Sequence, residues 1–252
     1  MKNRLVLIPG LEADTIRRRM LTRTFLTLLL ILAAIPALGV EPYSIEPAEL
    51  HPSDSFPPAL MSKLDPQGWL LSTESNGLKV SICEVFWVKI GIGQDRQPGT
   101  KTQSPYGGLE PGALVGVIYF LPEASEDYRE DFHDQKLEPG YYSMRYAPRP
   151  KGDPADVLLL SPVRADREAE PVLSQDELER RSRLASHSHE PAVLSLVPAE
   201  SGKEESPSVR MDDQGTCIFQ IKLQVKSGTG SSRESTLAVI LVTPRKGEGD
   251  AS

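Results

Sequence analysis

The residue types best suited to chemistry lie in two short segments where histidine stands beside a carboxylate. They read Asp131-Phe-His133-Asp134 and His187-Ser-His189-Glu190. Imidazole nitrogens and carboxylate oxygens bind zinc and similar metals, and alternate positions of an extended segment project to the same side. One hypothesis is therefore a metal-dependent hydrolase with ligands drawn from His133, Asp134, His187 and His189. Because neither spacing is a known metal signature, solvated loop histidines are the alternative.

Other catalytic signatures give little to build on. The acidic run at residues 123–131 could supply facing carboxylates for a glycosidase or oxygen ligands for calcium. The spacing of a calcium-binding loop is not met, however, and a solvated loop explains the run equally well. The chain contains no Gly-x-Ser-x-Gly, His-Glu-x-x-His or Cys-x-x-Cys motif. We therefore assign no catalytic residue and expect no cofactor.

A loop rich in glycine and proline, residues 91–112, is the predicted binding loop. Glycine-rich phosphate-binding loops open a helix, whereas strand patterns flank this segment, so a nucleotide site is not expected. Loops carried on a rigid scaffold commonly bind ligands. The candidate contacts are an aromatic ring and its flexible neighbours, Tyr106, Gly107 and Gly108.

Two cysteines, Cys83 and Cys217, stand in predicted strands. In an exported chain such a pair commonly forms a disulfide. Strand geometry can also hold the two Cα atoms too far apart for a bridge. A disulfide and two separate buried thiols are both consistent with the sequence.

The N-terminal segment has the features of a secretory signal peptide. Arg17, Arg18, Arg19 and Arg23 precede an uncharged apolar run at residues 25–40, which is too short for a typical membrane-spanning helix. Small residues in Ala37-Leu-Gly39 predict cleavage after Gly39. The alternatives are an uncleaved anchor and a twin-arginine signal, and translation could begin at Met1 or at Met20.

The net charge of the chain limits the classes of partner that it is expected to bind. The chain has 252 residues and a net charge of −7, and removal of residues 1–39 leaves a net charge of −11. An anionic chain does not bind nucleic acid through phosphate neutralisation, nor does it seek anionic membranes. We expect a periplasmic or secreted protein with no stable membrane span after cleavage.

Alternating apolar residues predict a mainly β protein. Strand patterns occupy residues 69–74, 78–90, 113–121, 141–146, 156–161, 192–197, 217–226 and 237–243. They favour an antiparallel β-sandwich, immunoglobulin-like or jelly-roll-like, with a closed barrel as the alternative. The expected organisation is a signal peptide at 1–39, a proline-rich lead-in at 40–60, one domain at 61–246 and a disordered tail at 247–252.

Three local patterns refine this expectation. Asn76-Gly77 predicts a β-hairpin turn, and Glu84 interrupts the apolar face of the second strand. A β-bulge explains that interruption, with a buried functional carboxylate as the alternative. Ser174 and Glu177 form a capping box that predicts one surface helix over residues 174–186.

Four segments resemble a group of exported bacterial β-rich proteins with a Gly-x-Tyr-x-x-Arg-Tyr strand. They begin at Cys83, Pro111, Leu137 and Pro191 and include Leu137-Glu-Pro-Gly-Tyr-Tyr-Ser-Met-Arg-Tyr146. The resemblance spans most of residues 60–243 and implies a secreted β-rich domain without an assigned function. Those relatives carry a longer, histidine-containing segment where this chain has only residues 147–155. No catalytic residue is carried over.

The leading functional hypothesis is a non-catalytic exported binding module whose ligand is a protein or a carbohydrate. The metal-dependent hydrolase is the second hypothesis. The third is a structural or assembly protein of the cell envelope, which would form a defined oligomer.

Overall fold

The computed structural model describes residues 43–51, 56–75, 77–94, 106, 108–125, 129–130, 134–148, 155–186, 188–199 and 206–243. The predicted signal peptide and C-terminal tail lie outside these residues and stay predictions. None of the described helices has both the length and the apolar character needed to cross a membrane.

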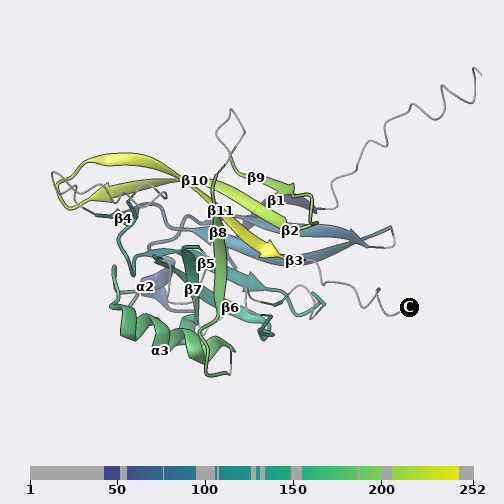
Figure 1. Ribbon diagram of the computed structural model, residues 1–252, viewed down its shortest axis with the longest axis horizontal. Helices are drawn as coiled ribbons and strands as arrows, with labels where there is room; N and C mark the ends of the chain where they lie inside the picture. The colour runs from purple at the N-terminus through teal and green to yellow at the C-terminus, as the bar shows by residue number, and fades with distance from the viewer. Residues whose placement is uncertain are drawn as a thin grey trace, which may run out of the picture. The chain divides into compact units, whose positions relative to one another are not determined.

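Eleven strands make up one sheet among the described residues (Figure 1). In chain order they are β1 (Tyr43–Glu49), β2 (Gln67–Ser75), β3 (Leu78–Trp87), β4 (Gly91–Gly93), β5 (Leu114–Phe120), β6 (Gly140–Ala147), β7 (Val157–Pro162), β8 (Val193–Val197), β9 (Ser208–Met211), β10 (Cys217–Ser227) and β11 (Ser232–Val242). The helices are α2 (Pro58–Met61), the 3-10 turn η2 (Val163–Ala165) and α3 (Gln175–Ser186).

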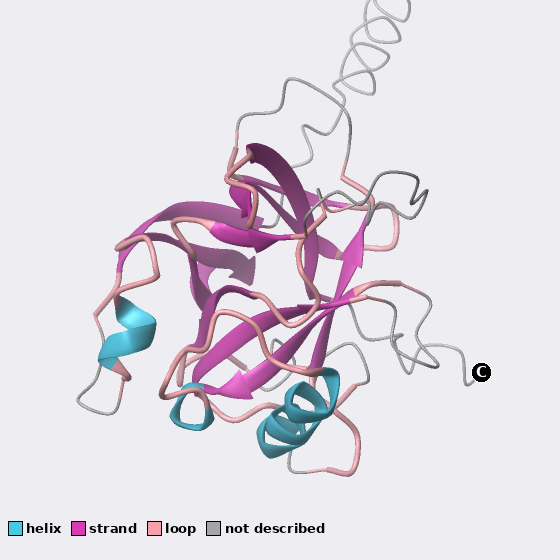
Figure 2. Cartoon of the chain, turned by 90° about the vertical axis from the view of Figure 1, so that its left-hand side faces the viewer, coloured by secondary structure: helices cyan, strands magenta, loops and turns pink. Residues whose placement is uncertain are grey.

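The strands pair in the order β1-β2-β3-β5-β6-β7-β8-β11-β10-β4, and β9 pairs with β10. Every pairing is antiparallel except that of β4 with β10. The sheet curls until β9 lies next to β1, so that it is nearly closed around a common interior (Figures 1 and 2). The mainly antiparallel β class is confirmed, whereas a two-layered sandwich is not.

The predicted hairpin between β2 and β3 is confirmed. Ser75 pairs with Leu78, and Gly77 adopts a φ of 73°, which glycine tolerates because it has no Cβ. The pairing register shifts where Leu71 faces Cys83 and Ser72 faces Ser81, which leaves Ile82 as the extra residue. The bulge therefore precedes Glu84 by two positions, and it turns Cys83, Val85 and Trp87 toward the interior while Phe86 packs in a second cluster outside.

The lead-in predicted at 40–60 is extended over residues 43–49, as expected, but its exclusion from the domain is wrong. Residues 43–49 form β1, and every residue of β1 pairs with β2. This strand therefore belongs to the same compact unit as the rest of the sheet. Pro47, which faces Trp69, is tolerated because β1 has only one hydrogen-bonded neighbour.

The main core fills the interior of the curled sheet. Trp87 of β3 stacks on Phe219 of β10 with ring centroids 5.9 Å apart and planes at 18°. Strands β3 and β10 are not neighbours in the sheet, so this stack joins its two opposed sides.

Helix α3 covers the outside of the sheet at β7 (Figure 1). Leu173 and Leu178 share a small apolar cluster with Val157, Leu159 and Val193. The backbone N–H of Glu177 donates to Ser174 Oγ at 3.4 Å, which is one half of the predicted capping box. The surface helix is confirmed.

Candidate functional site

A pocket of about 510 Å³ lies where β5 and β6 meet η2 and α3. We call it the tyrosine pocket. Its lining comprises Tyr119 of β5, residues 138–142 at the start of β6, residues 162–164 and Leu184 of α3. The volume is in the range typical of small-ligand sites.

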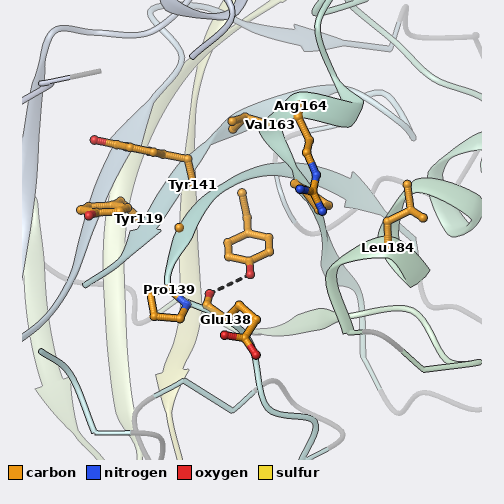
Figure 3. Close-up of a pocket in the computed structure, with 10 residues that line it drawn as sticks. Tyr119, Glu138, Pro139, Tyr141, Val163, Arg164 and Leu184 are labelled. Atoms are coloured by element: carbon orange, nitrogen blue, oxygen red, sulfur yellow. Dashed lines mark hydrogen bonds between the residues drawn. The ribbon is translucent and has the colours of Figure 1, made fainter. Parts of the chain in front are cut away.

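Two tyrosines form one wall of the tyrosine pocket (Figure 3). Tyr119 and Tyr141 are directly paired residues of β5 and β6, so the sheet register places them side by side. Their rings stack with centroids 4.2 Å apart and planes at 15°. The edge of Phe56 packs against Tyr141 at 5.1 Å, and Tyr141 Oη donates to the backbone oxygen of His51 at 3.1 Å. The wall is held on two sides.

Arg164 and Leu184 lie across the pocket from the tyrosine wall (Figure 3). Both side chains are exposed, and Arg164 forms no hydrogen bond or ion pair with any residue that the structure describes. Its guanidinium therefore keeps its donors for a ligand. Glu138 and Pro139 complete the rim, and the Glu138 side chain is exposed.

A buried ion pair fixes the turn that carries Arg164. Arg145 Nε donates to Asp166 Oδ2 at 2.8 Å and Arg145 Nη2 donates to Asp166 Oδ1 at 2.9 Å, and neither side chain is exposed. The remaining donors of Arg145 reach the backbone oxygens of Gly112 at 2.9 Å and Glu170 at 2.8 Å. This bidentate geometry satisfies the buried charge and ties η2 to β6.

Helix α3 joins the same network. Arg181 Nη1 donates to Asp166 Oδ1 at 3.2 Å, so two guanidinium groups share one carboxylate. Gly112, which accepts from Arg145, adopts a φ of 86°, and a Cβ at this position would lie 1.9 Å from the backbone oxygen of Leu173. Only glycine fits the close approach of these two loops.

The tyrosines of the pocket are neutral at physiological pH. Burial raises the pKa of Tyr142 to about 12, and the charge of Glu138 adds to this, although Arg129, Arg164 and a hydrogen bond partly oppose it. Burial followed by the charge of Glu84 raises the pKa of Tyr141 to about 12. Burial also raises the pKa of Tyr119. These phenols can pack and hydrogen-bond but do not act as bases.

Glu84 borders the tyrosine wall. It is the β3 partner of Tyr119, so that Glu84, Tyr119 and Tyr141 form one row across three strands. Burial raises the pKa of Glu84; the charge of His51 opposes this increase and that of Glu123 adds to it. Glu84 is half-buried beside the pocket but does not line it.

The predicted binding loop is anchored rather than free at its described positions. Tyr106 is only 4% exposed, and its ring meets Tyr146 edge-on at 6.2 Å within the core. The backbone oxygen of Gly108 accepts a hydrogen bond from Arg233 Nη2 at 3.0 Å. Gly107 and residues 95–105 lie outside the described residues. The prediction that Tyr106 offers a surface contact is wrong, because the ring packs inward.

The candidate metal ligands are only partly described. His133 and His187 lie outside the described residues, and Asp134 and His189 are both exposed. Gln135 joins the two segments, since its Nε2 donates to the Pro191 backbone oxygen at 3.2 Å and its Oε1 accepts from Ser188 Oγ. Across the described part of the chain, no three His, Cys, Asp or Glu side chains gather as a metal site. The metal hypothesis stays a prediction.

Cys83 and Cys217 are both buried in the main core, and no disulfide joins them in the structure. Burial raises the pKa of the Cys83 thiol well above its ordinary value, and the nearby Cys217 and Glu84 raise it further. The Cys83 side chain is therefore a thiol rather than a thiolate at neutral pH.

Sequence reasoning missed the tyrosine pocket. Tyr119 lies in an apolar run that predicts only a buried strand. Arg164 follows the predicted strand at residues 156–161, where the sequence gives no sign of a site. The adjacent tyrosines at 141 and 142 are the one local signal, since neighbouring strand residues point to opposite faces and one ring had to face outward.

No protein-family model, curated protein or solved structure matches this chain. The resemblance to exported bacterial β-rich proteins is therefore untested.

Proposed function

We propose that this protein is an exported, non-catalytic binding module that holds its ligand in the tyrosine pocket. The observation that carries the proposal is the placement of an aromatic wall, Tyr119 and Tyr141, opposite Arg164, whose guanidinium pairs with no other residue in the described part of the chain. An apolar surface with a few well-placed polar groups is the usual composition of a small-molecule site.

The chemistry of the lining supports binding over catalysis. Among the described residues that line the pocket there is no serine, threonine, cysteine or histidine. The phenols keep their protons at neutral pH, which leaves them as packing and hydrogen-bonding groups. Export remains part of the proposal through the signal-like segment at 1–39.

A thermal-shift screen with a chemically diverse library of small molecules tests the proposal. Compounds that raise the melting temperature of the wild-type protein should lose that effect in Arg164→Ala and in Tyr119→Ala. The matched control is Arg167→Ala, an exposed arginine three residues along the same turn that does not line the pocket. Stabilisation that persists in both pocket variants would place the binding site elsewhere.

The metal-dependent hydrolase is a second candidate, favoured by the contact of Gln135 with Ser188 and Pro191. Through that contact, the residue that follows Asp134 lies against the segment that ends at Glu190. Elemental analysis of the purified protein tests the idea. A stoichiometric transition metal that is lost in Asp134→Ala and His189→Ala would support it, and a metal-free protein after mild purification with supplied zinc would contradict it.

A further inference from the structure

We infer that the ligand of the tyrosine pocket is an acidic saccharide, a pyranose ring that carries a carboxylate. This inference rests on the proposed function, because it names the ligand class of the same pocket. It follows from three features of the lining, namely a cation, a set of hydrogen-bond acceptors and an apolar wall.

The cation selects an anionic group. Arg164 is exposed at the pocket and forms no ion pair with any residue in the described ranges. A guanidinium presents a planar set of donors that matches a carboxylate in a bidentate arrangement. The turn beneath it is fixed by the Arg145 to Asp166 pair, so the backbone from which Arg164 extends toward the pocket is rigid.

Several of the other polar groups of the pocket can accept hydrogen bonds from a ligand. The hydroxyl protons of Tyr141 and Tyr142 are already used, since Tyr141 Oη donates to His51 and Tyr142 Oη donates to the Glu138 backbone oxygen at 2.7 Å. Their oxygens remain available as acceptors. The exposed Glu138 carboxylate is also an acceptor. The hydroxyl groups of a sugar supply donors that these oxygens can accept.

The apolar wall fits a ring. Tyr119 and Tyr141 present stacked aromatic surface, and Leu184, 48% exposed, faces them (Figure 3). The C–H face of a pyranose can cover such a surface while its hydroxyls stay at the polar rim. A flat aromatic carboxylate would satisfy Arg164 but would make no hydrogen bond to Glu138, which a sugar hydroxyl can reach from the rim.

Ligand-observed NMR titrations of the full chain test the inference. The probes are short oligosaccharides of galacturonate, glucuronate and mannuronate, sialyllactose, and the matched neutral oligomers of galactose, glucose and mannose. We expect at least one acidic probe to bind about tenfold or more tightly than its neutral counterpart, because the charged hydrogen bonds to Arg164 are lost in the latter. The preference should vanish in Arg164→Ala, survive in part in Arg164→Lys and persist in Arg167→Ala.

Two outcomes would overturn the ligand class while leaving the binding function intact. One is equal affinity for acidic and neutral sugars, unchanged by Arg164→Ala but lost in Tyr119→Ala. The other is binding of a zwitterionic dipeptide such as Ala-Tyr, with no saccharide bound, since an ammonium group could also meet Glu138. The proposed binding function itself would be contradicted if the library screen found no compound whose stabilising effect is lost in Arg164→Ala or Tyr119→Ala.

Discussion

Arg145 and Asp166 form a fully buried bidentate ion pair that connects β6 to the turn bearing Arg164. Arg145 is the arginine of the Gly-x-Tyr-x-x-Arg-Tyr strand. Along that strand Tyr142, Met144 and Tyr146 face the main core, and Arg145 faces the other way. The opposite side is also buried, so this arginine has a structural role and positions the pocket.

Asp166→Ala should destabilise the protein by about 3–5 kcal/mol, because it leaves the buried Arg145 charge without its partner. Urea unfolding at neutral pH measures the change. Glu179→Ala removes the acceptor of an exposed ion pair with Arg183 on the same side of the molecule and should cost less than about 0.5 kcal/mol. Similar losses in the two variants would contradict the structural role of Arg145.

Glu84→Gln should raise the stability of the protein at about pH 7 and have little effect below about pH 4. The pKa of Glu84 is raised in the fold from its ordinary value of 4.5, chiefly by burial, so the folded chain holds this proton more tightly than the unfolded chain. That contribution is fully present below pH 4.5 and is lost as pH rises through the raised pKa. Thermal unfolding across this range measures it.

The exposed Glu74 of β2 provides the control for this experiment. Glu74→Gln should have little effect on the stability at neutral pH, because this side chain is exposed. A Glu84→Gln variant that is less stable than the wild type at neutral pH would show that the carboxylate makes a favourable contact, and would reverse the sign of the prediction.

Cys83 and Cys217 should resist alkylation in the folded protein. Both side chains are at most 1% exposed, and burial raises the pKa of Cys83. Iodoacetamide followed by intact mass spectrometry should show no modification under native conditions and two modifications in denaturant without reductant. An unmodified chain in denaturant that gains two groups only after reduction would instead establish a disulfide.

Export with cleavage after Gly39 should yield a mature chain that begins at Val40. Mass spectrometry of the protein recovered from the periplasm or the medium measures the mature N-terminus. Recovery of the full chain in the membrane fraction would instead support the uncleaved anchor.

Local patterns predicted the parts of the fold that local interactions determine. The helix over residues 174–186 and the turn at Gly77 follow from capping residues and from a glycine with positive φ, which act within a few residues. Strand β1 was missed because Pro47 within it and the prolines on either side argue against a strand, and only the pairing with β2 offsets that preference. Long-range pairing is not visible in one sequence.

The site was harder to predict than the fold for the same reason. Tyr106 sits among glycines and prolines, which are typical of an exposed loop, yet its ring packs against Tyr146. Tyr119 and Arg164 come together only after β5, β6 and the turn at η2 are assembled, and that assembly depends on Asp166 meeting Arg145. The spacing of residues along the chain does not predict a contact between Asp166 and Arg145.

The most direct test of the tyrosine pocket is NMR of the protein with ¹³C-labelled tyrosine rings, titrated with the strongest compound from the library screen. The ring signals of Tyr119 and Tyr141, assigned through Tyr119→Phe and Tyr141→Phe, should shift on binding, and the signal of the core residue Tyr106 should not. Shifts confined to tyrosines outside the pocket, with Tyr119 and Tyr141 unchanged at saturation, would contradict the proposed site.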